Sequence, residues 1–528
     1  MALLALTAFT LSAQTKLDHA AEVPVVSIDA VVTDKAGHRV TGLTKSDFVV
    51  TDDGKPQTIT NFQEVGVAAA PAPRRYLIFV DNDSLQPVVR KQCFAGLRKF
   101  VDAQLESGDQ ASVVIWNRSL EIAAPLTSDK NVLKAAIDAA EATQSPNSIR
   151  ASYSRVLQHC QRNLDMVRNA AMRGDIAYRD CTNVVRQEVS HLLNESRQMM
   201  NAVNVAMTTA AGAEGKKVLI LVGANLPEKP GYEVYRWANM THMHVMRGFD
   251  WPNEQPSDGD VKMQREMVEK LARSANAHGV SLYPIDAPPV ADAVGIQSKS
   301  GGDDFGADFL RMENTEAAFG TLAAMTGGMA IMRPPDFSAA IGSIAGDLDS
   351  YYAIGYQPPV TAGRDRVVAV RTKNRDYTVR ARQTYALKTA EEQMSDRVIA
   401  NIFSPTKSGW LVTLRAGAPQ QQGEGGTFVV PVEVTVPPTL TLLSEEGKLT
   451  GGLTVYIAVG VKQGALSTMS RSPQAVVVPA AEEAAFRSMP ITFGVNLTLK
   501  RGENLVSIAV VDQVSRAAGF ARTTIITP

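Results

Sequence analysis

Apolar and polar residues alternate near the start of the chain. From Val26, the apolar residues Val26, Ile28, Ala30 and Val32 occupy every second position until the turn-like stretch Asp34–Gly37. Two further extended runs follow, around Phe48–Val50 and Thr58–Phe62. A period of two is typical of strands that bury one face. We therefore predict a small N-terminal β unit over 23–65, followed by a linker rich in Pro and Ala.

From Tyr76 onward the pattern changes to strands that are apolar throughout, separated by segments with apolar residues at helical spacing. Continuous apolar strands are typical of a parallel sheet whose two faces are covered by helices. The order strand, helix, strand, helix predicts an α/β domain over 75–387, with a doubly wound, mostly parallel sheet. Its expected strands are Tyr76–Val80, Ala111–Trp116, Lys217–Val222, Val280–Ile285 and Met329–Met332.

The segment from about 147 to 212 is too long for a single crossover and carries two helical stripes. We predict a helical hairpin inserted into the α/β domain. Cys160 lies on its first stripe and Cys181 on its second, so the two face each other if the turn lies near Met172–Asp175. A disulfide requires Cα atoms roughly 4.4–6.8 Å apart. Two buried free thiols are the alternative.

The later part of the chain contains less regular segments and then a second alternating region. Residues 228–260 combine prolines and tryptophans with little periodicity and are expected to form a surface loop. Three extended runs follow Tyr351, and a helical linker is expected over 388–407. From 408 to 528, alternating runs separated by Gly and Pro predict an immunoglobulin-like β-sandwich.

Composition excludes several classes of function. The chain has 53 Lys and Arg against 54 Asp and Glu, a net charge of -1, and so lacks the positive excess that nucleic-acid binding requires. Three cysteines are too few for a four-thiolate zinc or iron–sulfur site. We also find no serine-nucleophile turn, metalloprotease motif, phosphate-binding loop or dinucleotide glycine pattern, and we predict that the protein is not an enzyme.

The first thirteen residues, MALLALTAFTLSA, form an apolar block that ends in small residues. This pattern is typical of a secretory signal, although the usual positive residues at its start are missing. We predict a signal peptide over 1–14, no membrane span after its removal, and a secreted, periplasmic or cell-surface protein. An apolar N-terminus of a cytosolic protein is the alternative.

The first parallel strand ends in LIFVDNDSL, and ligands of open α/β sheets bind at the carboxyl ends of the strands. This placement and the order of later strands resemble a von Willebrand factor A (VWA) domain. More specifically, three blocks resemble the VWA-related domain of secreted acidobacterial proteins. These blocks are VSIDAVVTDKAGHRVTGLTKSDFVVTDDGKPQTITNF, YLIFVDND and YYAIGYQPP with YTVRARQTY.

VWA domains that bind ligand through a metal use a DxSxS loop, a Thr from a second loop and an Asp from a third. Asp81 matches the first position, but Asp83 and Leu85 stand where the serines belong. The third loop offers Gly223-Ala224-Asn225 without an Asp, and the second, Thr143-Gln144-Ser145, lacks the expected Gly-Thr. We therefore predict a degenerate metal-ion-dependent adhesion site and no cofactor.

The resemblance implies that the protein binds a protein or a cell-surface polymer at the rim of the sheet. The candidate rim residues are Asp81, Asn82, Asp83, Ser84 and Asn225. Two alternatives stay open. Asp81 and Asp83 could hold Mg²⁺ or Ca²⁺ together with water, which would make a metal-dependent adhesion module. The second alternative is an extracytoplasmic hydrolase that acts through carboxylates which form no visible motif in the sequence.

Overall fold

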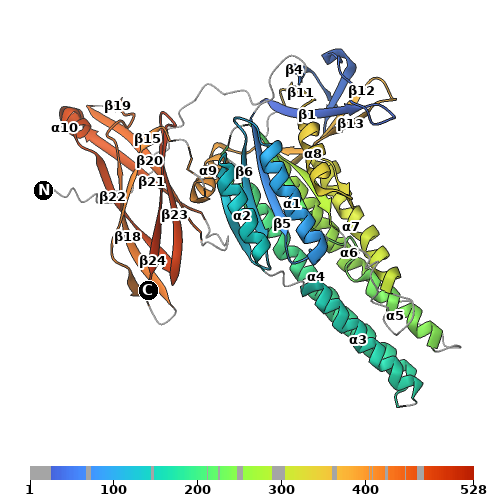
Figure 1. Cartoon of the computed structure of the whole chain (residues 1–528). Coiled ribbons are helices and arrows are strands. Elements are labelled where there is room, and N and C mark those ends of the chain that lie inside the picture. The colour runs from blue at the N-terminus through green and yellow to red at the C-terminus, as the bar shows by residue number, and fades with distance from the viewer. Residues whose placement is uncertain are drawn as a thin grey trace.

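The structure is a computed structural model of the 528-residue chain. It describes residues 25–66, 73–143, 148–169, 171–210, 212–213, 215–223, 226–245, 254–287, 304–358, 365–403, 405–406, 408–422, 426–445, 447–460 and 469–528. The expected signal peptide, 1–14, lies outside these residues and stays a prediction. Figure 1 shows a β-rich module, a central α/β domain and a C-terminal β domain.

The α/β domain is built on a six-stranded sheet with the order β10-β9-β8-β5-β6-β7. All neighbouring strands are parallel except β7, which runs antiparallel to β6. The strands are β5 (Arg74–Asp81), β6 (Gln110–Trp116), β7 (Leu120–Thr127), β8 (Lys216–Gly223), β9 (Val280–Asp286) and β10 (Ile331–Met332). The predicted fold class, a mostly parallel sheet with helices on both faces, is confirmed.

Helices cover both faces of this sheet because its central strands bury side chains on both sides. In β5, Tyr76, Ile78 and Val80 pack into one apolar core, while Leu77 and Phe79 pack into the other. The first core is closed by α1 (Pro87–Ala103), α2 (Lys130–Ala142) and α8 (Phe337–Leu348). The second is closed by α4 (Gly174–Thr208), α6 (Asp258–His278) and α7 (Asp304–Thr326).

The N-terminal strands pair with strands that follow the α/β domain. β1 (Val26–Thr33) runs antiparallel to β11 (Tyr351–Tyr356) and to β13 (Thr378–Ala381), and β11 also pairs with β4 (Ile59–Val65). The remaining pairs join β2 (Phe48–Asp52) to β3 (Lys55–Gln57) and to β12 (Asp365–Thr372), and β12 to β14 (Thr384–Ala386). We call β1–β4 and β11–β14 the β module, which has its own apolar core. The division between 23–65 and 75–387 that the sequence suggested therefore cuts through paired strands.

A buried carboxylate organises the interior of the β module. Asp52 accepts hydrogen bonds from Arg366 Nε at 2.7 Å, from the Tyr385 hydroxyl at 2.6 Å and from the Tyr356 hydroxyl at 3.0 Å. A buried charge is tolerated when it is paired and hydrogen-bonded in this way. These bonds tie β2, β11, β12 and β14 together.

A second buried carboxylate, Asp347 of α8, joins the β module to the α/β domain. It forms ion pairs with Arg39 and Arg380 of the β module and accepts a hydrogen bond of 2.8 Å from the Tyr283 hydroxyl of β9. Burial alone raises the pKa of the Asp347 carboxyl, but the two guanidinium groups hold that pKa below its usual value. The two parts are therefore linked by charge as well as by strand pairing.

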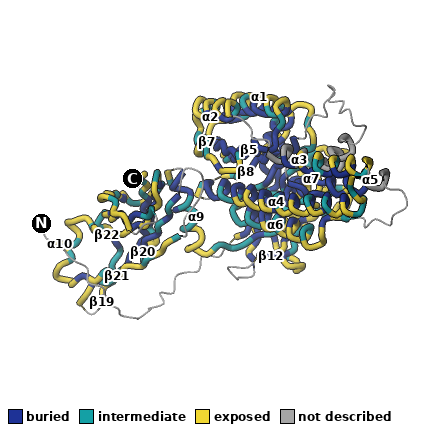
Figure 2. The backbone as a smooth tube through the Cα atoms, turned by 90° about the horizontal axis from the view of Figure 1, so that it is seen from below, coloured by how far each residue is buried: buried dark blue, intermediate teal, exposed yellow. Residues whose placement is uncertain are grey.

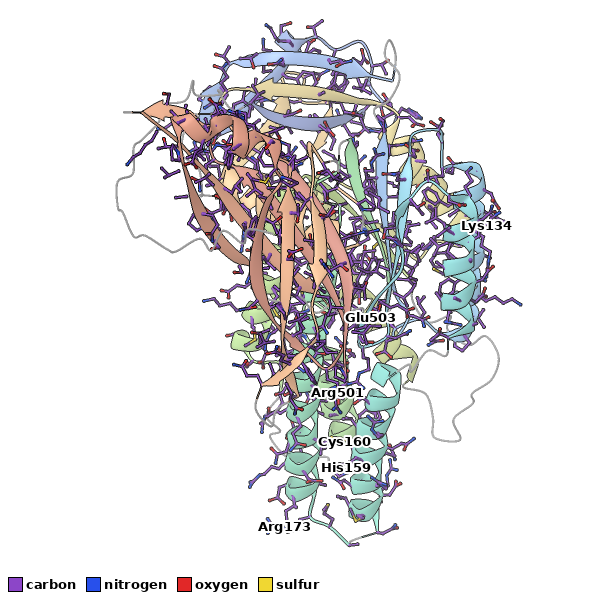
Figure 3. All side chains as sticks on the ribbon, turned by 90° about the vertical axis from the view of Figure 1, so that its left-hand side faces the viewer. Lys134, His159, Cys160, Arg173, Arg501 and Glu503 are labelled. Atoms are coloured by element: carbon purple, nitrogen blue, oxygen red, sulfur yellow. A yellow bond between two sulfur atoms is a disulfide. The ribbon has the colours of Figure 1, made fainter. Side chains whose placement is uncertain are left out.

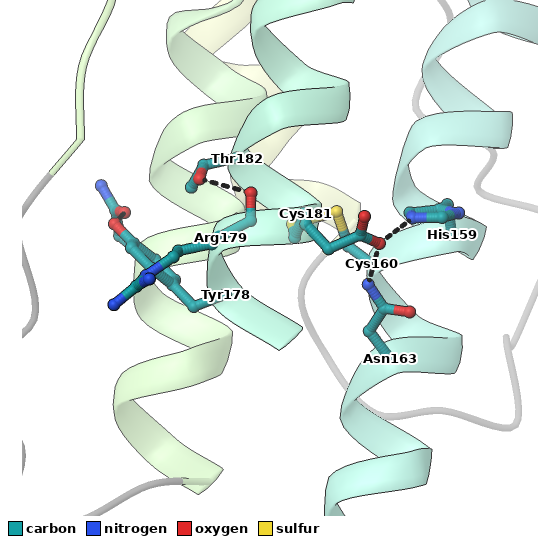
Figure 4. The surroundings of a disulfide bond; sticks show 9 residues. His159, Cys160, Asn163, Tyr178, Arg179, Cys181 and Thr182 are labelled. Atoms are coloured by element: carbon teal, nitrogen blue, oxygen red, sulfur yellow. Dashed lines mark hydrogen bonds and ion pairs between the residues drawn. A yellow bond between two sulfur atoms is a disulfide. The ribbon is translucent and has the colours of Figure 1, made fainter. Parts of the chain in front are cut away.

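The segment from 148 to 208 folds as two antiparallel helices, α3 (Ser148–Arg168) and α4. Cys160 and Cys181 face each other between them and form a disulfide, with their Cα atoms 4.9 Å apart (Figure 4). Beside the disulfide, Asp180 accepts a hydrogen bond of 2.8 Å from Asn163 and lies 2.6 Å from the His159 ring. Figure 3 shows Arg173 at the far end of the hairpin, beyond Cys160 and His159.

The prediction of a surface loop over 228–260 is wrong for the central part of this segment, which forms α5 (Tyr232–Val245). Val234, Tyr235 and Ala238 recur at helical spacing and pack on the disulfide region of the hairpin. In the sequence, the Met, His and Trp residues between these positions made the helical spacing difficult to recognise. Among the described residues, no helix combines the length and the apolar character needed to span a membrane.

The C-terminal domain consists of two facing sheets around one apolar core. Helix α9 (Ala390–Phe403) precedes it and packs on β20, β23 and β24. One sheet contains β15 (Trp410–Leu411), β19 (Leu443–Glu445), β20 (Lys448–Gly460), β21 (Ser470–Pro479), β23 (Gly502–Asp512) and β24 (Ala518–Thr527). The other contains β16 (Thr413–Ala416), β17 (Gln420–Gln422), β18 (Thr427–Val436) and β22 (Ile491–Lys500), and α10 (Glu483–Ser488) lies between β21 and β22 in sequence. Figure 2 shows buried residues concentrated inside this domain and along the α/β sheet.

Removing the disulfide should destabilise the hairpin. The cysteines are 21 residues apart, and in the chain-entropy model closing a loop of this size contributes about 3 kcal/mol. We expect Cys160→Ser with Cys181→Ser to lower the free energy of urea unfolding by about that amount. Dithiothreitol should lower the stability of the wild-type protein and leave the double variant unchanged. An equal effect of dithiothreitol on both proteins would contradict the assignment.

Candidate functional site

The candidate site lies at the carboxyl ends of the parallel strands. β5 ends at Asp81 and continues through 82–86 into α1, whose first residue is Pro87. The chain turns there because the Asn82 N–H bonds to the carbonyl of Val80 and to that of Trp116, at the end of β6. β8 ends beside β5 at Gly223, and β9 ends beside β8 at Asp286.

The residues expected to line an open rim are buried. Asp81 is 2% exposed, Asn82 0%, Asp83 2% and Ser84 7%. The structure brings these four together in one turn, as their adjacency in sequence requires. The fifth candidate, Asn225, lies outside the described residues.

Helix α4 carries an acidic side chain near this end of the sheet. Glu195 of α4 pairs with Arg118, which follows β6, at 3.1 Å, and lies 3.4 Å from the His191 ring. Burial raises the pKa of the Glu195 carboxyl; His191 and Arg118 counteract this, and the charge of Asp83 adds to the increase. Glu195 of α4 therefore lies within electrostatic reach of Asp83 in the turn.

Asp81 is an unusual carboxylate for a ligand site. Its Oδ1 is buried and has no hydrogen-bond partner among the described residues. Burial raises the pKa of Asp81 to about 7; the nearby negative charge of Asp83 acts in the same direction, and hydrogen bonds from Ser84 only partly offset the increase. Close to neutral pH, a large fraction of Asp81 therefore carries a proton in the folded protein.

The surroundings of Asp81 do not fit a magnesium ion, which requires near-octahedral oxygen ligands. Leu85, at the position of the second serine, is apolar and buried. Gly223 lacks a side-chain donor, and a Cβ there would meet the Asp81 Cβ at 2.9 Å. Among the described residues, no group of three or more His, Cys, Asp or Glu side chains is arranged for metal binding.

The side chain of an arginine, Arg90, instead joins the turn after β5 to the loop after α2. Arg90 of α1 donates hydrogen bonds to Asn82 Oδ1 at 2.6 Å, to the Ala140 carbonyl at 2.7 Å and to the Thr143 carbonyl at 2.5 Å. The guanidinium therefore connects the turn after β5 to the end of α2, where the second loop begins. Gln144 and Ser145 of that loop lie outside the described residues.

Sequence reasoning missed one acidic residue at this end of the sheet. Asp286 is the last residue of β9, lies in register with Gly223 and is 1% exposed. The Ala287 N–H bonds to the Gly223 carbonyl at 3.0 Å and holds the two strand ends together. The signal was present in VSLYPID, an apolar strand that ends in a carboxylate just as LIFVD does.

Comparisons with known proteins give only distant similarities. No family model and no curated protein matches this chain. An aerotolerance-related membrane protein from Bacteroides fragilis NCTC 9343, solved with multiple mutations to serines, is 10% identical over 52% of this chain and 98% of its own, with a TM-score of 0.24. The vWF domain of the type V pili tip protein Mfa5 from Porphyromonas gingivalis is 13% identical over 53% of this chain and 96% of its own, with a TM-score of 0.28.

A structure of three N-terminal domains of the same pili tip protein is 10% identical over 95% of this chain and 76% of its own, with a TM-score of 0.25. At these identities and TM-scores the similarity carries no argument about function.

The buried state of Asp81 predicts a dependence of stability on pH. Its pKa is about 7 when folded against 3.8 for the unperturbed group, so between these values the folded state holds a proton that the unfolded state has lost. Stability therefore falls as pH rises through this window. Asparagine cannot ionise at this position. As pH rises from about 4.5 to about 8, the free energy of urea unfolding of Asp81→Asn should therefore increase relative to that of the wild type by a few kcal/mol.

The matched control is Asp102→Asn, which removes an exposed carboxylate that pairs with Lys134 at 2.9 Å. This variant should keep the pH dependence of the wild type. If Asp81→Asn shows the wild-type pH dependence as well, Asp81 is not the titrating group.

Proposed function

We propose that this protein is an exported, VWA-related binding protein of the acidobacterial secreted family. It recognises a protein or a cell-surface polymer through contact surfaces, without capture of a carboxylate by a metal ion. The three sequence blocks that resemble this family support the proposal, and so does the doubly wound sheet between them.

The observation that carries the proposal is the burial of the turn after β5. A partner carboxylate must reach an open coordination position at that turn if a metal is to bridge the two molecules. Asp81 and Asp83 are each only 2% exposed, and the charge of Asp83 acts on Glu195 of α4. The burial of both carboxylates therefore supports recognition without a bridging metal.

The end of the α3–α4 hairpin offers a surface for contact instead. The hairpin extends away from the body of the α/β domain (Figure 1). Near its turn, Met166 is 38% exposed and Ile176 is 48% exposed. Arg168 and Arg173 lie close by in the sequence and are both paired with carboxylates, at 3.0 and 3.1 Å. Apolar side chains surrounded by charged residues are typical of recognition surfaces.

The disulfide and the apolar N-terminal sequence support export. Cys160 and Cys181 are joined, and disulfides persist in oxidising compartments outside the cytoplasm. The remaining thiol, Cys93, is buried, and burial raises its pKa to about 12. A thiol of that kind is a core residue and has little reactivity.

Affinity capture from the native cell envelope tests the function. The immobilised wild-type protein should retain the same partners with Mg²⁺ and with EDTA. Met166→Glu with Ile176→Glu should reduce capture at least about tenfold, because a charge disrupts an apolar contact. Val132→Glu, at an α2 residue that is 45% exposed, should capture as the wild type does.

Loss of capture in EDTA would support the metal-dependent alternative that uses Asp81 and Asp83. Equal capture by the hairpin and α2 variants would exclude the hairpin as the contact surface. Hydrolysis of envelope polymer that disappears in Asp81→Ala would overturn the binding function in favour of an enzyme.

A further inference from the structure

The helical hairpin carries an excess of positive charge that the rest of the chain does not share. Residues 148–208 contain eight arginines, five acidic residues and no lysine, whereas the whole chain has a net charge of -1. The imbalance is greatest in α3, whose sequence SIRASYSRVLQHCQRNLDMVR has four arginines and a single carboxylate, Asp165. The hairpin is therefore a basic projection on a protein that is otherwise slightly acidic.

The carboxylates of the hairpin are engaged within the protein. Asp165 pairs with Arg168 at 3.0 Å, and Asp175 pairs with Arg173 at 3.1 Å. The other three carboxylates lie on α4 and are either buried or paired with a neighbouring side chain: Asp180, Glu188 and Glu195. None of these pairs involves the exposed arginines in the middle of α3.

Two arginines in the middle of α3, Arg155 and Arg162, are exposed and form no ion pair with any residue that the structure describes. Asp165 follows Arg162 by three residues, but it is held by Arg168 and accepts a hydrogen bond of 3.3 Å from Gln161. An exposed guanidinium without a carboxylate partner in its own chain is available to an external anion.

Arg155 and Arg162 lie on one face of α3, and that face points away from α4. They are seven residues apart, which is about two turns and roughly 10 Å along the helix axis. Cys160, which bonds to Cys181 of α4, marks the opposite face, because two residues along a helix correspond to a rotation of about 200°. Met166 is 38% exposed and follows Arg162 by four residues, on the same face. We call Arg155 and Arg162 the arginine face.

We propose that the arginine face binds an acidic polysaccharide, a polymer with repeated carboxylates. The planar fork of each guanidinium matches a carboxylate bidentately. A single ion pair at an exposed position contributes little, so a small acid gains too little to stay bound. A polymer can engage both arginines, and its second contact then forms at a high effective concentration.

The polysaccharide proposal rests on the proposed function, because it uses the same hairpin as the contact surface. It narrows the partner from a protein or a cell-surface polymer to a polymer of defined charge. The shape of the surface favours this choice: the two arginines are spaced along a straight helix, and an extended chain can follow that line.

Binding of alginate, a polyuronate, to the full-length protein tests the arginine face. In EDTA and at low salt, alginate should bind saturably by biolayer interferometry, and the neutral polymer dextran should not bind. Added NaCl should weaken the binding of alginate, because salt screens exposed charges. Arg155→Gln with Arg162→Gln should raise the dissociation constant at least about tenfold, because both bidentate contacts are lost.

The matched control is Lys91→Gln with Lys99→Gln, which removes two positive charges from exposed positions on α1. This variant should bind alginate as the wild type does. An equal loss of affinity in the two double variants would mean that net charge alone decides binding, and it would overturn the assignment to the arginine face.

A second measurement uses the wild-type protein and so does not depend on how the variants fold. Alginate should slow the modification of Arg155 and Arg162 by phenylglyoxal, measured by peptide mass spectrometry. Arg371, an exposed arginine on β12, should react at the same rate with and without alginate.

Absence of saturable alginate binding, or of protection at Arg155 and Arg162, would overturn the proposal. Tighter binding of poly-L-glutamate than of alginate would also overturn it, in favour of an acidic protein as the partner. In each of these cases, envelope capture that is lost in Met166→Glu with Ile176→Glu would still support the proposed function, so the two failures are distinguishable.

Discussion

The pairing of β1 with β11 is the constraint on which the rest of the structure depends. It holds Val26–Ala30 against Tyr352–Tyr356, and the whole α/β domain lies between these strands in the sequence. The pairing places Ser27, Asp29 and Tyr351 against the amino ends of β8 and β9, where Asp347 adds its ion pairs to Arg39 and Arg380. The amino end of the sheet is therefore an internal junction, and its carboxyl end points the other way, toward the hairpin.

The two ends of the sheet solve opposite electrostatic problems. At the carboxyl end, acidic side chains are buried, and the pKa of Asp81 rises to about 7, which lowers the cost of its burial. Arg90 holds the loops there by hydrogen bonds to Asn82 and to two carbonyls. At the amino end, charged side chains are paired: Lys216 lies 3.2 Å from Asp29, and Asp347 forms ion pairs with two arginines. The sheet therefore relieves buried charge by protonation at one end and by ion pairing at the other.

The sequence predicted those features whose signal is local. Strands such as LIFVD are apolar on both faces, and this property alone indicates a covered parallel sheet. Pairing of the N-terminal strands was not predictable in this way, because Asp52 and its partner Arg366 are 314 residues apart. The burial of the turn after β5 was not predictable for a related reason: it depends on parts of the chain that are distant in the sequence, whereas loop residues after a strand are usually exposed. Met263 falls on the same helical stripe as Leu271, yet it is 40% exposed, whereas Gln264 beside it is buried.

The β module also sets an order for biosynthesis. β1–β4 leave the ribosome or translocation channel first, yet β11–β14 emerge only after about three hundred further residues, at roughly 5–20 residues per second. During that interval the early strands present unpaired edges, which are sites of aggregation. Formation of the α/β domain brings its two ends together and shortens the effective loop between β1 and β11, which lowers the entropic cost of their meeting. The central domain thus acts as an internal template for the strands that flank it.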